Sequence, residues 1–124
     1  MRINLPVSAR EVKLGEGDTI VTRTDLKGRV TYANESFLRI TGFARSALIG
    51  KPHNVIRHPD MPPEAFADLW RTLEAGYPWS GVIKNRCANG DHYWVRANVT
   101  PVREHGEITG YLSVRTRASA ESIA

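Results

Sequence analysis

The chain has 124 residues, of which 41% are hydrophobic and 24% charged, as is typical of one globular domain. This length excludes an enzyme with separate cofactor and substrate lobes, and no apolar run reaches the about 18 residues of a membrane span. The net charge of +4 comes from scattered Lys and Arg residues, which favours a solvated surface over a nucleic-acid interface.

Cysteine content and the N-terminal sequence both bear on the cellular compartment. Cys87 is the only cysteine, so neither an internal disulfide nor a cysteine-rich zinc site can form. The N-terminus lacks the apolar stretch of a signal peptide. Both features predict a cytoplasmic protein. Because Cys87 precedes an Ala-Asn-Gly turn, we expect it near the surface, as an inert thiol.

The N-terminal third contains the first hairpin. Residues 1–18 show weak periodicity and are interpreted as a peripheral or mobile lead-in. Alternating β-branched residues predict strands over 19–24 and 29–34. A turn from Asp25 to Gly28 joins them, since Asp favours the first position of a turn and Gly tolerates positive φ at its end.

Helices are predicted in the middle of the chain. Asn34 can cap a helix that ends at Gly42, and a further helical turn is expected over 46–50. A longer amphipathic helix is predicted over 61–76. Its apolar residues share one face: Phe66, Leu69, Trp70 and Leu73.

Period-two alternation predicts strands over 80–86, 92–103 and 108–117. Asn89-Gly90 is a strong two-residue hairpin signal between the first two of these strands. Residues 19–117 therefore form one α+β domain, an antiparallel sheet with helices on one face and a ligand space between. Residues 118–124 are interpreted as the start of an outgoing helix.

The densest polar cluster lies in residues 53–62. Arg57 could recognise a phosphate or carbonyl, with His58 and Asp60 as nearby donor and acceptor. A metal site made by His53, His58 and Asp60 is disfavoured, because no cysteine accompanies them. The structural alternative is a loop held by its own hydrogen bonds, with Asp60 capping the next helix.

Aromatic residues and amides surround the predicted ligand space. The candidates are Trp70, Trp79, Tyr93 and Trp94, with the amides of Asn85 and Asn98. Such a set suits a flat heteroaromatic ligand, because rings stack on its faces and amides match its edge. Ordinary core packing is the alternative for each aromatic residue. Alternation places Tyr93 and Asn98 on opposite faces of their strand, and both faces are partly apolar.

Three stretches closely resemble the N-terminal PAS domain of bacterial aerotaxis receptors: HNVIRHPDMPPEAFADLW, PWSGVIKNRCANGDHYWVRANVTPV and GYLSVRTRA. The resemblance covers residues 18–118 and implies a PAS fold with a five-stranded antiparallel sheet and short helices. It also implies a non-covalently bound FAD that senses redox state or electron transport. In that family the signal passes to a membrane-anchored HAMP and signalling region that controls a chemotaxis kinase.

The resemblance also assigns roles to individual residues. It places the segment needed for FAD binding at Arg57, His58 and Asp60. It places a tryptophan near the flavin at Trp79 and an amide near the flavin ring at Asn85. The positions that affect signalling are Asn34 and Phe66, together with Asn85 through its amide. Further pocket candidates are Trp70, Tyr93 and Asn98.

Other functions compete with the flavin sensor. A haem or small-ligand PAS sensor could use His53 or His58, and a ligand-free PAS domain would serve only for dimerisation. None of the residues 50–60 is a cysteine, so we do not expect the light-driven cysteine adduct of blue-light-sensing flavin PAS domains. The sequence contains neither a Ser/His/Asp or Cys/His arrangement typical of catalysis nor a phosphate-binding glycine loop. We therefore expect that the protein is not an enzyme. The expected partners are FAD, the receptor's own signalling region and a second copy, without nucleic acid or membrane insertion.

Overall fold

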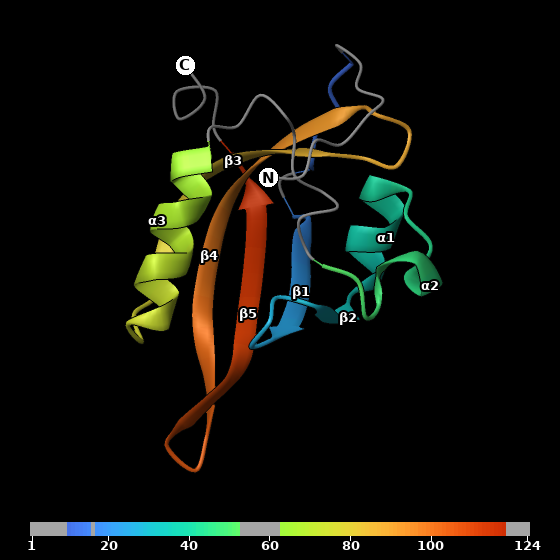
Figure 1. Ribbon diagram of the computed structural model, residues 1–124. Helices are drawn as coiled ribbons and strands as arrows, with labels where there is room; N and C mark the ends of the chain where they lie inside the picture. The colour runs from blue at the N-terminus through green and yellow to red at the C-terminus, as the bar shows by residue number, and fades with distance from the viewer. Residues whose placement is uncertain (1–9, 16, 53–62, 119–124) are drawn as a thin grey trace.

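The computed structural model describes residues 10–15, 17–52 and 63–118, which form a five-stranded antiparallel sheet in the order β2-β1-β5-β4-β3 (Figure 1). The elements in chain order are β1 (Thr19–Asp25), β2 (Val30–Ala33), α1 (Glu35–Thr41), α2 (Arg45–Leu48), α3 (Pro63–Glu74), β3 (Trp79–Arg86), β4 (His92–Glu104) and β5 (Glu107–Arg117). The predicted α+β class and all five predicted strands are confirmed, and no bound of a strand differs by more than one residue.

The β1–β2 turn is fixed by its first residue. Asp25 Oδ1 accepts hydrogen bonds from the backbone N–H groups of Lys27 and Arg29, each at 2.9 Å. Gly28 has a φ of 80°, the left-handed conformation that side chains disfavour. These contacts confirm the predicted turn and explain why Asp and Gly occupy its two ends.

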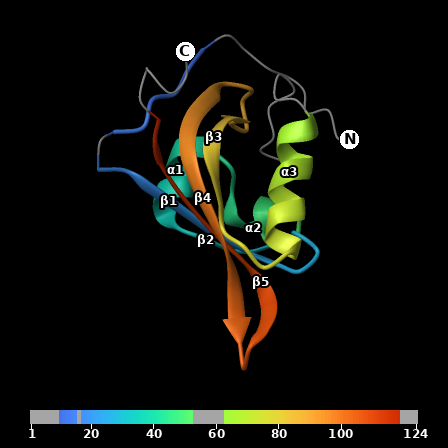
Figure 2. The same ribbon diagram turned by 90° about the vertical axis from the view of Figure 1, so that its left-hand side faces the viewer.

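Helix α1 begins and ends as predicted. Asn34 Oδ1 accepts a hydrogen bond from the backbone N–H of Phe37 at 3.1 Å, and Gly42 ends the helix with a φ of 75°. Helix α2 follows one residue earlier than the expected 46–50. Together α1 and α2 lie beside the β1–β2 end of the sheet, whereas α3 lies beside β4 (Figures 1 and 2).

Helix α3 is the predicted amphipathic helix. Leu69 and Leu73 are buried in the core, while Phe66 and Trp70 are half-buried against it. The helix ends two residues before the predicted 76, and the predicted residues 61 and 62 lie outside the described residues. Its C-terminal end closes where Gly76, with a φ of 90°, donates to the Leu73 carbonyl.

The β3–β4 connection differs from the predicted two-residue turn. Cys87 N–H donates to the Asp91 carbonyl at 2.7 Å, which closes a three-residue loop over 88–90, and Gly90 has a φ of 94°. A three-residue hairpin loop places its glycine in the left-handed region after an ordinary turn. The Asn-Gly signal therefore locates the hairpin correctly but not the loop length.

Cys87 is buried, with 3% of its surface exposed, so the expectation of a surface thiol was wrong. The adjacent loop docks on the end of α1, where Ala88 N–H donates to the Thr41 carbonyl at 2.8 Å. Burial raises the pKa of Cys87 to about 11, helped by the negative charge of Asp91 and opposed by Arg86. The thiol is therefore protonated at neutral pH.

Part of the lead-in is built into the domain. Val12 N–H donates to the His92 carbonyl at 2.7 Å, and His92 N–H donates to the Arg10 carbonyl at 3.0 Å. Leu14 is buried in the core. Residues 10–14 are thus more than the peripheral segment expected, because Glu11 forms a bridge with His92 at the start of β4. The predicted outgoing helix lies outside the described residues, apart from the buried Ala118.

Candidate functional site

One face of the sheet, here called the inner face, is covered by the helices. Strand register places these residues on it: Ile20, Thr22, Thr24, Trp79, Gly81, Ile83, Asn85, Tyr93, Val95, Ala97, Val99, Tyr111, Ser113 and Arg115. Helix residues touch it from both sides: Phe37 of α1 contacts Arg115, and Trp70 of α3 contacts Tyr111. The ligand space expected between sheet and helices lies over this face.

Asn85 and Tyr93 are direct cross-strand partners on the inner face. They are 4% and 0% exposed, so both polar groups are buried. The Tyr93 hydroxyl makes no hydrogen bond to any residue that the structure describes. Burial raises the pKa of Tyr93 far above its ordinary value, against the opposing effects of the Arg115 charge and the nearby Asn85 amide. Asn85 is thus a polar neighbour that lowers the pKa of this hydroxyl, although no hydrogen bond of standard geometry joins the two side chains.

Arg115 brings a buried positive charge to the same face, and the sequence reasoning missed it. It is 2% exposed, and its Nη2 donates to Thr22 Oγ1 at 2.7 Å. Its guanidinium lies 5.1 Å from the centroid of the Phe37 ring, within cation–π range. Burial lowers the pKa of Arg115, an effect that Tyr93 opposes. The sequence did contain one signal for this position. Arg115 lies four residues after Tyr111 on the same strand, so both side chains point to the inner face.

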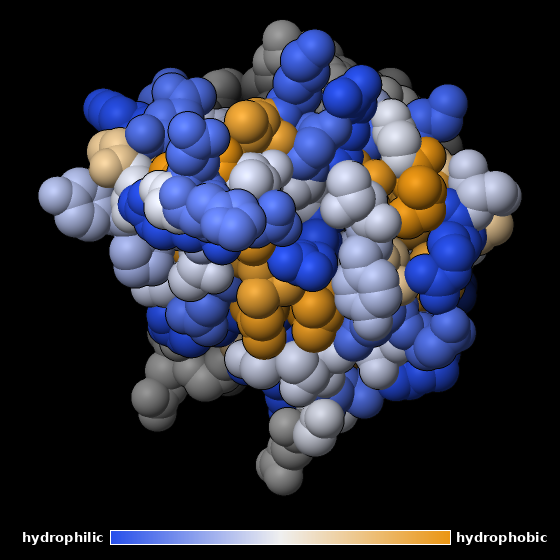
Figure 3. Space-filling model, turned by 90° about the horizontal axis from the view of Figure 1, so that it is seen from below, coloured by the Kyte–Doolittle hydropathy of each residue, from blue (hydrophilic) through white to orange (hydrophobic). Residues whose placement is uncertain are grey.

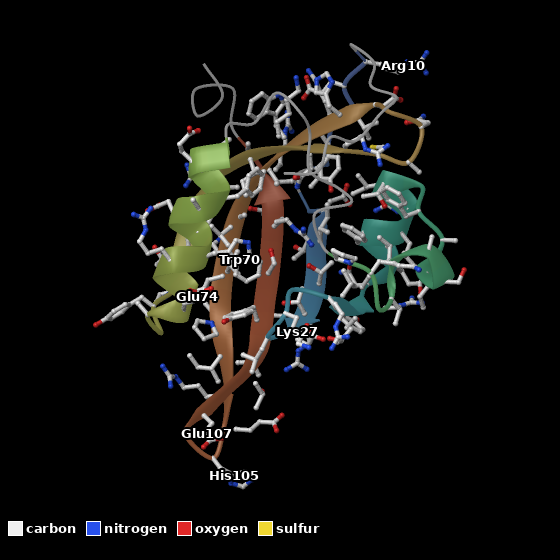
Figure 4. The ribbon with its side chains drawn as sticks, in the orientation of Figure 1. Arg10, Lys27, Trp70, Glu74, His105 and Glu107 are labelled. Atoms are coloured by element: carbon white, nitrogen blue, oxygen red, sulfur yellow. The ribbon has the colours of Figure 1, made fainter. Side chains whose placement is uncertain are left out.

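The two predicted pocket tryptophans reach the inner face from different elements. Trp79 begins β3, and its six-membered ring lies against Gly81. Trp70 projects from α3 toward β5 (Figure 4), where its ring meets that of Tyr111 edge-on at 5.5 Å between centroids. Beside Trp70 is a mostly apolar cavity of about 60 Å³, also lined by Thr24, Leu69, Leu73, Val99, Tyr111 and Ser113.

A family model for the PAS fold matches residues 30–115, which include most of the sheet and all three helices described above. The chain belongs to the PAS family. It is 51% identical over 118 residues to the aerotaxis receptor of Escherichia coli (strain K12), an alignment that covers 95% of this chain and 23% of that protein. The predicted relationship to aerotaxis receptors is therefore confirmed.

Further relatives of this PAS domain extend the comparison. It is 30% identical over 101 residues to a nitrogen fixation regulatory protein of Klebsiella pneumoniae, covering 81% of this chain and 20% of that protein. A solved Light-Oxygen-Voltage domain, studied with a flavin analogue, superposes with a TM-score of 0.76 at 24% identity, covering 83% and 79% of the two chains. The chain thus spans about a quarter or less of the length of these curated relatives.

Asn34 and Phe66, the residues tied to signalling by resemblance, occupy different settings in the PAS domain. Asn34 joins β1 to α1, because its Oδ1 also accepts from Val21 N–H at 3.1 Å while its Nδ2 donates to the Thr19 carbonyl at 3.0 Å. Phe66 is half-buried on α3. Neither is a direct neighbour of Asn85 in the strand register.

Asn98 is not brought to the inner face. It points to the opposite side of β4 and is exposed, since residues 93 and 98 differ by an odd number of positions along one strand. Its assignment as a pocket residue is therefore corrected. Arg57, His58 and Asp60, with His53, lie outside the described residues, so their assignments remain predictions.

A second hollow of about 340 Å³ lies between the β1–β2 and β4–β5 hairpins. Charged side chains of both signs line it, Arg23 and Asp25 on β1 and Glu104 on β4. Figure 3, which views the molecule from this end, shows small hydrophobic patches separated by hydrophilic side chains. This open, mixed surface lacks the buried aromatic lining of the inner face, so the inner face is the stronger candidate site.

The described part of the chain contains neither a metal-binding cluster nor a membrane-spanning helix. Within those ranges no three His, Cys, Asp or Glu residues are grouped so as to hold a metal ion. None of the helices described there has the length and apolar character to cross a membrane.

Proposed function

We propose that this PAS domain binds FAD non-covalently on its inner face and reads redox state or electron transport for aerotaxis. The observation that carries the proposal is the pair of buried polar groups at Asn85 and Tyr93, one of them without a hydrogen-bond partner among the described residues. A buried hydroxyl left unpaired costs about 1–3 kcal/mol, which a bound ligand can recover. Similarity to the aerotaxis receptor of Escherichia coli supports the same function.

The inner face fits a flavin in chemical type. A flavin ring is flat and carries donors and acceptors along its edge, and when bound it supplies the electron-accepting chemistry. Asn85 offers an amide donor and acceptor, Tyr93 a neutral hydroxyl, and Arg115 a positive charge. Trp79 and Trp70 supply aromatic surface beside them. By resemblance, Arg57, His58 and Asp60 complete the binding set.

Asn85 is the proposed sensing residue. Its side chain can rotate to exchange acceptor for donor, so it can respond to a change in protonation at a facing ligand edge. Because Asn85 belongs to β3 and pairs with Tyr93 of β4, its rotation would change contacts between two strands. A coupling of about 1–3 kcal/mol between the two states suffices for signalling. Asn34 and Phe66 are proposed to act in transmission.

The proposed setting is a cytoplasmic sensor module within a longer receptor. The matched relatives are about four times longer than this chain or more, since it covers 23% and 20% of them. We propose that the signal passes to a HAMP and signalling region of the same protein, with a second copy as a further partner. In this proposal the domain has no catalytic activity of its own.

The test begins with the visible absorption spectrum of the freshly purified domain, followed by chromatography of any released compound. A yellow protein that releases FAD and bleaches on reduction supports the proposal. A sharp haem band, or a colourless protein that refuses added FAD, overturns it in favour of a haem sensor or a ligand-free dimerisation domain.

The role of Asn85 is tested with Asn85→Asp and Asn85→Ala. At FAD concentrations that saturate each variant, redox-dependent protease sensitivity should disappear in both Asn85→Asp and Asn85→Ala. Asn98→Ala is the matched control, because this amide lies on the exposed face of the neighbouring strand. Redox dependence that persists in both Asn85 variants would contradict the amide mechanism.

A further inference from the structure

Trp79 is tied to helix α3 by a hydrogen bond. Its indole Nε1–H donates to Asp68 Oδ2 at 3.1 Å, so a residue of the inner face is linked to a residue of the helix that covers it. Trp79 is half-buried, whereas the Asp68 side chain is 61% exposed. Asp68 therefore has little packing of its own, and its polar contacts define its part in the structure.

The other polar contact of this carboxylate is weak. Arg71 Nη2 lies 3.8 Å from Asp68 Oδ1, between two exposed side chains one turn apart on α3. Exposed ion pairs of this kind contribute little. The indole bond is shorter and directional, with a charged acceptor. These two contacts indicate that the Asp68 carboxylate orients the Trp79 indole rather than stabilising α3.

Gly81 leaves room for the six-membered ring of the same indole. A Cβ atom at Gly81 would lie 2.6 Å from Trp79 Cη2 and 2.9 Å from Cζ2, closer than real Cβ contacts allow. The Gly81 backbone does not lie in the left-handed region, so its conformation does not require glycine. The glycine is needed for space: it lets the ring rest against the strand.

We propose that Asp68 is a positioning residue that, with Gly81, fixes the Trp79 indole against the inner face and links that face to α3. The inference rests on the proposed function in one respect, namely that the inner face is where the flavin binds. A ring fixed at two points, its Nε1 and its six-membered ring, presents one defined surface to a ligand. A change that moves this ring would also displace the Asp68 carboxylate through their hydrogen bond, and with it α3.

The first test uses the ligand-free domain and needs no flavin. Its three tryptophans give separate indole N–H signals in a ¹H–¹⁵N NMR spectrum, and Trp79→Phe identifies the signal of Trp79. Asp68→Ala should shift this signal and speed its exchange with water about tenfold, the equivalent of one lost hydrogen bond. Asp68→Asn should restore the native signal, because the amide oxygen can still accept.

Matched controls separate positioning from a general effect. Arg71→Gln removes the ion pair and should leave the Trp79 signal unchanged. Gly81→Ala should displace the ring even though Asp68 is present. Gly17→Ala is its control, since a Cβ there meets nothing within 4 Å. A Trp79 signal that is identical in Asp68→Ala and the native domain would overturn the inference.

The second test asks whether the positioning reaches the ligand. A nearby indole quenches flavin fluorescence, so in the FAD-loaded domain Asp68→Ala should brighten the emission and Asp68→Asn should not. Emission that is unchanged in Asp68→Ala, despite a shifted indole signal, would refute the link to the ligand. Failure of the domain to bind FAD would refute the proposed function alone, because the NMR result on the ligand-free domain would still stand.

Discussion

The start of α1 and the inner face at β3–β4 differ in how their polar side chains are paired. At the start of α1 the Asn34 side chain makes three hydrogen bonds, to Val21, Phe37 and Thr19. At β3–β4 the Tyr93 hydroxyl is buried without a partner among the described residues, although the Asn85 amide lies nearby. The first arrangement stabilises the fold, whereas the second leaves hydrogen-bonding capacity unused.

Under the proposed function, the first region serves stability and the second serves binding. Buried polar groups in folded proteins are almost always paired, so an unpaired one needs a reason. A ligand that completes the hydrogen bonds supplies that reason for the inner face. Substitutions that remove polar groups should therefore have opposite effects on the stability of the ligand-free domain in the two regions.

The largest effect is expected for Asn34→Ala. This variant leaves the backbone groups of Val21, Phe37 and Thr19 without their side-chain partner, and the free energy of unfolding should fall by about 2 kcal/mol. Urea denaturation followed by circular dichroism measures it. Asn98→Ala, at an exposed amide, should change the value by less than about 0.5 kcal/mol. Equal effects of both variants would mean that the three hydrogen bonds of Asn34 do not stabilise the fold.

A smaller effect of opposite sign is expected for Tyr93→Phe. Removing the unpaired hydroxyl should raise the free energy of unfolding of the ligand-free domain by about 1 kcal/mol, while FAD affinity falls. Urea denaturation and FAD titration measure the two quantities. Tyr77→Phe is the matched control, because Tyr77 is 66% exposed, and it should change neither. Destabilisation by Tyr93→Phe would mean that its hydroxyl is already paired within the domain.

The smallest effect is expected at Cys87, the residue directly before the 88–90 loop that docks on α1. Its pKa is raised from 9.0 to about 11, so the unfolded chain loses this proton at lower pH than the folded domain does. The thiol's contribution to stability is thus complete below about pH 9 and is lost as pH rises toward about 11. Urea midpoints measured across this range should fall less steeply for Cys87→Ala than for the native domain.

Reactivity gives a second measurement at the same residue. Cys87 is 3% exposed and protonated at pH 8, so a thiol reagent should label it slowly in the native domain and rapidly in urea. Rapid labelling without urea would show that the 88–90 loop leaves α1 readily, contrary to the docked position described above.

Several features of the site could be predicted because they depend on residues close together in the chain. Asn34 was predicted as a helix cap from its position before an apolar helical pattern, and the structure confirms it. Trp79, Asn85 and Tyr93 were predicted as a group, and the register brings all three to one face. Asn98 was included because its type suited the ligand, although its spacing from Tyr93 already placed it on the other face.

The missed features depend on contacts between distant parts of the chain. Arg115 resembles an ordinary surface arginine in sequence, and only the pairing of β5 between β1 and β4 buries it. Asp68 resembles a solvent-facing helix residue, and only the approach of β3 to α3 gives it the Trp79 indole. The spacing of Arg115 from Tyr111 indicates its face of β5, but neither contact can be read from the local sequence, because its partner comes from another element.

The sequence by itself determined the element order, the α1 cap, the β1–β2 turn and the alternation that separates the two faces of the sheet. These follow from dihedral preferences and side-chain spacing within a few residues. Three features depend on tertiary packing: the burial of Cys87, the burial of Arg115 and the hydrogen bond between Trp79 and Asp68. Each of these depends on which elements pack together, and burial, charge and hydrogen bonding change with that packing rather than with the neighbouring sequence.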